Sequence, residues 1–195
     1  MKADIDKIKE LREKTSLSVM ECKNALEKTN GDLEKALEYL KKRGFEMSEK
    51  KESRETKEGL IGSYVHINGK VGTLVEVNCE SDFVSRNEEF KELVKNICLQ
   101  ITATSPKYID RNSVPDEEKN KIKDIVKEEF KDKKEEIIEK IIEGKLNDFY
   151  KENVLLDQIY VKDENITVGE YIKSKIAKLG ENIKVKRFSR FEIGE

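Results

Sequence analysis

The sequence contains no tryptophan, two prolines and a single histidine, His66, among its 195 residues. One histidine excludes any metal site that needs two imidazole ligands and any acid–base mechanism shared between histidines. No apolar run approaches the roughly 20 residues of a membrane-spanning helix, and the opening MKADIDKIKE lacks the apolar stretch of a signal peptide. We therefore expect a soluble, cytoplasmic protein without a membrane partner.

The three cysteines, Cys22, Cys79 and Cys98, form no close pair and no zinc-binding spacing. The sequence also lacks the motifs GxxxxGK(S/T), GxGxxG and HExxH, so neither a cofactor nor a metal is expected. Cys79 and His66 lie on the two strands of one predicted hairpin and could approach each other. A nucleophilic pair, however, needs a third group that orients the base. We therefore interpret Cys79 as a buried strand residue and do not expect an enzyme.

Charged residues make up 41% of the chain and apolar residues 36%, against typical values of roughly 25% and 45–50%. Each element must therefore have one narrow apolar face. Lys and Arg total 39 and Asp and Glu total 41, which gives a formal net charge of −2. A dedicated nucleic-acid binder usually carries a basic excess. The balance favours a protein partner and no direct contact with nucleic acid.

The first 45 residues carry the signals of three short helices. Ser18 followed by Glu21 is a capping box, in which the hydroxyl and the carboxylate each satisfy a free backbone amide. Asn30-Gly31-Asp32 predicts the end of one helix and the start of the next, because Gly tolerates a left-handed cap and Asp accepts from the first amides. Gly44 is expected to end the third helix. Residues 1–45 are therefore predicted to form a helical domain.

A strongly charged segment follows this helical domain. Residues 46–58, EMSEKKESRETKE, contain nine charged residues and one apolar residue, Met47. Such a segment cannot bury enough apolar surface to pack. We predict a charged linker or a solvated helix here, followed by a core domain of residues 59–195.

The core is predicted to begin with a β-hairpin. Apolar residues alternate over residues 61–67 and 71–79, and Asn68-Gly69 between them supplies turn residues that tolerate positive φ. A helix is expected over residues 90–101, where apolar residues recur at helical spacing.

The second half of the core is predicted to be mainly helical. A polar helical region is expected over residues 116–150, interrupted at Gly144, and a further helix precedes the last strand. Residues 183–193 alternate as a strand in which Phe188 has the opposite parity, and this indicates either a bulge or a strand with two apolar faces. A hairpin and one distant strand, covered by helices, predict an α+β fold with a three-stranded antiparallel sheet packed against helices.

The junction between strand and helix carries a candidate binding site. In NCESDFVSRNEEF, residues 78–90, Asp82 lies beside Phe83 where the strand ends. An acid and an aromatic at such a junction form a compact probe, in which the ring enters an apolar slot and the carboxylate meets a cation. The alternative is that Asp82 caps the following helix and Phe83 packs in the core. Spacing alone favours this second interpretation, because capping acids and core aromatics are common.

Three segments resemble the elongation factor Ts family in their order and spacing. They are IKELREKTSLSVMECKNALEKTNGDLEKALEYL near the N-terminus, VEVNCESDFVSRNEEF in the middle and IAKLGENIKVKRFSRFE near the C-terminus. The length is that of the shorter bacterial type with one core module. The resemblance implies that the N-terminal helices form a domain similar to ubiquitin-associated domains.

The resemblance also implies the function of a guanine nucleotide exchange factor for elongation factor Tu, the GTPase that carries aminoacyl-tRNA. In the family, the segment that matches Ser81-Asp82-Phe83-Val84 approaches the partner's magnesium site, and the Phe acts as a wedge. The motif is tied to displacement of Mg²⁺ from bound GDP. Ser81 stands where the family usually has Thr, and it keeps the hydroxyl.

Partner binding is implied for the N-terminal helices as well. Family residues that match Arg12, Val19 and Met20 hold the nucleotide domain of the partner. Val19 replaces a bulkier Met of some relatives, so its contribution is expected to be smaller. Short members of the family are thought to act as dimers, and a homodimer is therefore a candidate assembly.

An alternative of another class is a non-exchanging adaptor that binds a protein or peptide through its ubiquitin-associated-like helices. A pure adaptor has no use for the pair formed by Asp82 and Phe83, so this pair distinguishes the two functions. An enzyme that uses Cys79 is a more distant alternative.

Overall fold

Three helices form the N-terminal part of the chain in the computed structural model, which describes residues 4–15 and 17–194. They are α1 (Ile5–Thr15), α2 (Val19–Lys28) and α3 (Leu33–Glu49). The predicted capping box is confirmed, because the Glu21 amide donates to the Ser18 hydroxyl and the Ser18 amide to the Glu21 carboxylate, each at 3.2 Å. The apolar stripes of the helices meet in a small core made of Leu11, Cys22, Ala25, Leu26, Ala36 and Leu40.

The third helix does not end at Gly44. α3 continues to Glu49 and lies against α8 (Val168–Leu179). A Cβ on Gly44 would come within 3.3 Å of the Cβ of Ala177, so the missing side chain lets the two helices approach closely. The prediction of a helix end is wrong because this glycine serves helix packing.

The charged segment 46–58 is packed in part. Its first residues complete α3, and β1 begins at Glu58. Ser48 and Lys51 are buried, and the Ser48 hydroxyl is satisfied by donating to the Phe45 carbonyl at 2.8 Å. The expectation that this segment cannot pack is wrong for these two residues. The division of the chain into domains of residues 1–45 and 59–195 stays a prediction.

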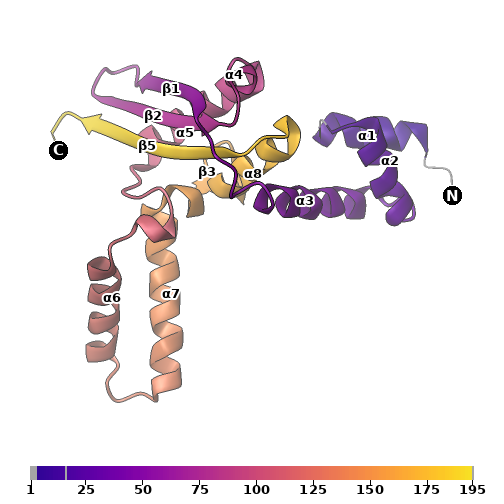
Figure 1. Ribbon diagram of the computed structural model, residues 1–195. Helices are drawn as coiled ribbons and strands as arrows, with labels where there is room; N and C mark the ends of the chain where they lie inside the picture. The colour runs from indigo at the N-terminus through magenta and orange to yellow at the C-terminus, as the bar shows by residue number, and fades with distance from the viewer. Residues whose placement is uncertain (1–3, 16, 195) are drawn as a thin grey trace.

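A three-stranded antiparallel sheet forms the centre of the remaining chain (Figure 1). Its strands, in spatial order, are β1 (Glu58–Val65), β2 (Val71–Cys79) and β5 (Ile183–Glu192). Two helices, α5 (Glu88–Thr104) and α8, pack on one face. The fully buried residues of that layer include Val75, Val77, Phe90, Leu93, Ile97 and Ile101. The predicted α+β fold is confirmed.

Of the two alternatives for the last strand, the structure shows the bulge. Glu76 of β2 pairs with Arg187, but the next residue, Val77, pairs with Val185. The extra residue in β5 reverses its parity, so Phe188 packs against the core while Phe191 is exposed.

Further elements surround this core, and a helical hairpin projects from it (Figure 1). They are α4 (Asp82–Ser85), α6 (Asp116–Glu129), α7 (Glu135–Asn153), β3 (Ile159–Tyr160) and β4 (Asp163–Thr167). The antiparallel pair β3–β4 was not foreseen, because its strands are very short and lack clear alternation. Gly144 lies inside α7, so the expected interruption at this glycine is wrong. The two helices of the hairpin are separated near residues 130–134 instead.

Two strand glycines allow a matched test of the packing between the sheet and α5. An added Cβ on Gly62 would clash with Cγ1 of Val94 and lie 3.0 Å from Sγ of Cys98, whereas one on Gly72 would meet only ordinary contacts at 3.6 Å. Gly62→Ala should lower the free energy of unfolding by about 1–3 kcal/mol through overpacking. Gly72→Ala should leave it nearly unchanged in urea denaturation. Equal effects of the two substitutions would contradict this packing.

Candidate partner-binding site

The predicted probe lies on a single helical turn directly after β2. Ser81 is the N-cap of α4, and its hydroxyl accepts from the Val84 amide at 3.4 Å. Val84 is buried with 6% of its surface exposed, whereas Phe83 is 80% exposed. The turn is therefore anchored by one apolar side chain and presents the next aromatic ring to solvent.

The acidic residue of the probe is exposed too. Asp82 forms an ion pair with Arg86 at 2.9 Å, and the side chains are 62% and 79% exposed. Such a pair contributes little because water screens it, so a partner can replace it at low cost. The interpretation in which Asp82 caps a helix and Phe83 enters the core is wrong, since Ser81 supplies the cap and the ring lies outside.

Sequence reasoning missed a residue that holds this turn from beneath. The carboxylate of Glu181 accepts hydrogen bonds from the Ser81 hydroxyl at 2.6 Å, the Ser81 amide at 3.0 Å and the Glu80 amide at 3.1 Å. Glu181 follows α8, about a hundred positions along the chain. No local pattern in the sequence could connect it with Ser81.

The predicted partner-binding residues of the N-terminal helices form a second exposed group. Arg12 lies on α1, and Val19 and Met20 occupy the first turn of α2. Val19 is 52% exposed and Met20 63%. The structure places this group away from α4, and the two are connected through α3 and the segment before β1 (Figure 1).

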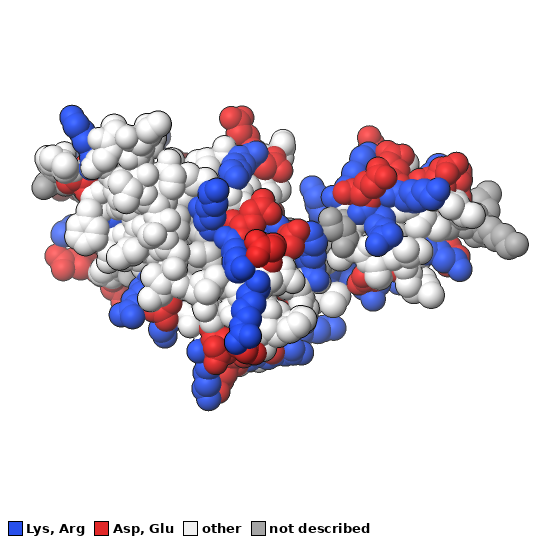
Figure 2. Space-filling model, turned by 90° about the horizontal axis from the view of Figure 1, so that it is seen from above, with Lys and Arg blue, Asp and Glu red and all other residues white. Residues whose placement is uncertain are grey.

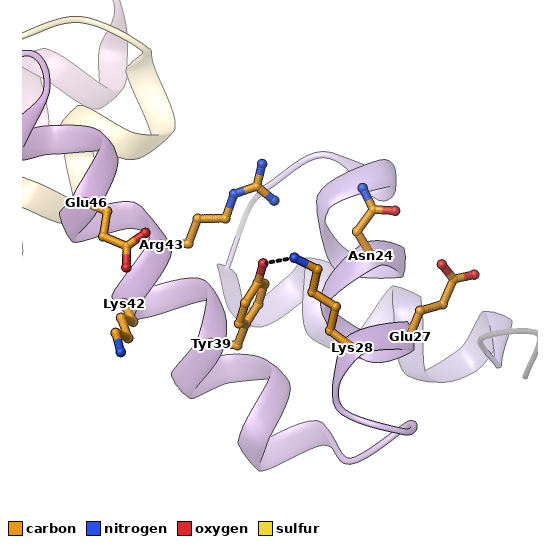
Figure 3. Close-up of a pocket in the computed structure, with 7 residues that line it drawn as sticks. All are labelled: Asn24, Glu27, Lys28, Tyr39, Lys42, Arg43 and Glu46. Carbon is orange, nitrogen blue, oxygen red and sulfur yellow. Dashed lines mark hydrogen bonds between the residues drawn. The ribbon is translucent and has the colours of Figure 1, made fainter.

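A groove between α2 and α3 holds none of the predicted site residues (Figure 3). It has a volume of about 710 Å³ and is lined by charges of both signs, among them Glu27, Lys42 and Arg43. Lys28 donates to the Tyr39 hydroxyl at 2.8 Å, and this hydrogen bond lowers the pKa of Tyr39. The mixed charge gives the groove no preference for an anion or a cation.

The structure does not bring Cys79 and His66 together. In the register of the hairpin Cys79 pairs with Glu58 at one end, while Val65, the residue before His66, pairs with Gly72 at the other. Seven strand residues at about 3.4 Å each separate the two ends by roughly 24 Å. Burial also raises the pKa of the Cys79 thiol to about 11, so the thiol stays protonated near neutral pH.

Within residues 4–15 and 17–194, no group of three or more His, Cys, Asp or Glu side chains could hold a metal ion. No helix in this described part of the chain is both long enough and apolar enough to cross a membrane.

Comparison with known proteins assigns the chain to a family. A sequence model described as "Elongation factor TS" matches residues 3–195. The chain is 55% identical over 190 residues to elongation factor Ts of Thermosipho melanesiensis, covering 96% of this chain and 97% of that protein. It is 52% identical over 197 residues to the protein of the same name from Fervidobacterium nodosum, with 100% of both chains covered. The chain belongs to the elongation factor Ts family.

Membership of the elongation factor Ts family makes this protein a translation elongation factor. The relatives match along the whole chain, so both exposed groups, on α1–α2 and on α4, lie within the region shared with elongation factor Ts. An identity of 50% to elongation factor Ts of Thermotoga neapolitana, over 100% of this chain, agrees with this assignment.

The exposure of Phe83 predicts how its removal affects the free protein. Phe83→Ala should leave the melting temperature within about a degree of the unsubstituted protein, because an exposed ring stabilises no fold. Phe90→Ala is the matched control, since Phe90 is fully buried. It should cost about 3–5 kcal/mol. A large loss of stability in Phe83→Ala, measured by thermal and chemical unfolding, would show that the ring is part of the core.

Proposed function

We propose that this translation factor is a guanine nucleotide exchange factor, which binds elongation factor Tu in its GDP form and promotes release of GDP. The single observation that carries the proposal is the 80% exposure of Phe83 on a turn anchored by Val84. The same turn holds the family motif, at the positions where the resemblance implies a wedge. An aromatic ring held out in solvent has its apolar surface available for burial in a pocket of a partner.

Exchange of this kind depends on differential binding. A factor that binds the nucleotide-free GTPase more tightly than the GDP form weakens GDP binding by the same factor, because the two affinities are linked. Loss of Mg²⁺ near the diphosphate leaves the negative charges of GDP less well compensated. A wedge near the ion therefore needs no nucleophile, cofactor or metal of its own. We accordingly propose that the protein is not an enzyme and that it acts in the cytoplasm, where translation takes place.

The two exposed groups are proposed to divide the work. Arg12, Val19 and Met20 on α1 and α2 hold the nucleotide domain of the partner, and Asp82 and Phe83 on α4 disturb its magnesium site. Val19 and Met20 are adjacent in the sequence, so two apolar side chains lie on the same helical turn. A non-exchanging adaptor would use only this first group, so the wedge distinguishes the two functions.

The direct test is the release of labelled GDP from purified elongation factor Tu. Substoichiometric amounts of this protein should accelerate release many-fold and leave GTP hydrolysis by the isolated GTPase unchanged. Absence of acceleration, with binding intact, would leave the adaptor as the better description.

Two substitutions should distinguish the role of Phe83 on α4 from that of the binding group on α1 and α2. Burial of Phe83 is worth about 1.5–3 kcal/mol, so Phe83→Ala should lower the maximal rate of GDP release by roughly 10- to 100-fold. Met20→Ala should instead raise the concentration that gives the half-maximal rate and change the maximal rate little. The division of work would be refuted if Phe83→Ala changed only that concentration, measured by titrating each variant into labelled GTPase.

A homodimer is the assembly that we infer from the outer face of the sheet. Ile61 and Val65 of β1 point away from the helices, and Leu74 of β2 and Phe191 of β5 lie on the same face of the sheet. All of these are exposed, Ile61 to 71%. The view from above shows a broad area without charged residues over the end of the molecule that carries the sheet (Figure 2). An apolar sheet face of this kind suits an isologous contact, in which two copies use the same surface.

Light scattering tests the homodimer. The unsubstituted chain should have twice the mass of its monomer, and Ile61→Lys should shift it to the monomer, because two buried ammonium groups would face each other across the contact. Ile125→Lys is the control, since Ile125 is similarly exposed, at 62%, but lies on α6 outside the sheet. A monomeric unsubstituted chain at micromolar concentration would refute the inferred dimer.

A further inference from the structure

Three chain connections that are far apart in sequence meet beneath α4. Residues 80–81 join β2 to α4, residues 181–182 join α8 to β5, and residues 52–54 belong to the segment between α3 and β1. As described above, the Glu181 carboxylate receives three hydrogen bonds from Glu80 and Ser81. The Glu181 side chain therefore ties the start of residues 81–85, which we call the wedge turn, to the connection between α8 and β5.

The contact is reciprocal. The Glu80 carboxylate accepts a hydrogen bond from the backbone amide of Asn182 at 2.6 Å. The side-chain amide of Asn182, which is 2% exposed, donates to the carbonyl of Glu52 at 3.2 Å and to that of Arg54 at 2.9 Å. Each of the two acids therefore binds the backbone of the other's connection, and the asparagine adds the third connection.

Two cations offset the charges of this junction. The Arg54 guanidinium lies 3.5 Å from the Glu80 carboxylate. Lys51 is 8% exposed and is attracted electrostatically to both Glu80 and Glu181. These two cations partly offset the electrostatic repulsion between the two carboxylates.

The turn of α4 is anchored by the buried side chains of Val84 and Ser85, but the orientation of its N-cap depends on a side chain from another connection. α4 has four residues, and the hydrogen bond from the Val84 amide to the Ser81 hydroxyl is long, at 3.4 Å. The same hydroxyl donates its single proton to Glu181 at 2.6 Å. The carboxylate of Glu181 thus orients the cap of the helix from which Phe83 projects.

We propose that Glu181 is a positioning residue for nucleotide exchange, which holds α4 so that Phe83 meets the partner in one orientation. The inference rests on the proposed exchange function and adds a residue to it. In this role Glu181 acts through α4 and not by its own contact with the partner. A merely structural role, in which Glu181 only secures α8 against the sheet, is the competing explanation.

The experiment compares Glu181→Ala and Glu181→Gln in GDP release from elongation factor Tu. Loss of the charged acceptor should lower the maximal rate about 10-fold in Glu181→Ala. Glu181→Gln keeps a neutral carbonyl acceptor, so it should lower the rate about 3-fold. The concentration for the half-maximal rate should change little in both variants, because the group on α1 and α2 still binds.

A double variant tests whether Glu181 acts through the wedge. In a Phe83→Ala background, Glu181→Ala should cause almost no additional loss of rate, because the oriented ring is already absent. Its effect on the melting temperature should persist in that background. A purely structural role would give the same stability loss without this dependence on Phe83.

Glu89→Gln is the matched control. Glu89 at the start of α5 accepts from Lys175 and Lys178 of α8, each at 2.6 Å, so its loss loosens the contact between α5 and α8 without touching residues 80–84. This variant should have a lower melting temperature. When it is assayed well below that temperature, it should still accelerate GDP release from elongation factor Tu as much as the unsubstituted protein does.

The outcomes separate the two proposals. If the unsubstituted protein does not accelerate GDP release from elongation factor Tu, the exchange function is wrong and the positioning role is wrong with it. If it releases GDP and Glu181→Gln has the unsubstituted maximal rate, or if the losses of Glu181→Ala and Phe83→Ala multiply, only the positioning role is wrong. If Glu181→Ala does not fold, the rate of Glu181→Gln decides the question.

Discussion

The antiparallel pairing of β2 with β5 is the contact on which the other features of this protein depend. It joins Cys79 to Ile183 at the end where both strands meet helices, and so brings the residues just outside the two strands together. The wedge turn begins on one side of this end and Glu181 lies on the other. A shift of one residue in this register would turn every side chain of β5 to the opposite face. The bulge after Val185 then adjusts the far half of the strand, so that Phe188 reaches the core.

Burial on one face of the sheet and exposure on the other separate stability from binding. The inner face packs on α5 and α8 and contains the fully buried apolar residues. Exposed apolar side chains are found at the outer face of the sheet, on α4 and at the start of α2, as well as at several separate positions on other elements. None of these exposed side chains contributes to the core, which agrees with a protein that uses them to bind partners. The low apolar content of the chain makes such exposure more informative, because few apolar residues are available for it.

The N-terminal helices and the wedge are connected by packing and by hydrogen bonds. α3 lies against α8 through the close approach of Gly44 and Ala177. The segment after α3 meets the wedge junction through the side chain of Asn182. Both of the exposed groups are thus held by the same α8–β5 region.

The sequence by itself determined the local structure and the family. The capping box of Ser18, the hairpin and the alternation of the last strand follow from local hydrogen-bonding groups and from periodicity, which neighbouring residues largely decide. Tertiary structure alone decided whether Phe83 is buried, why Gly44 is glycine and what Glu181 binds. Each of these depends on residues far along the chain, because burial and long-range hydrogen bonds exist only once the strands have paired.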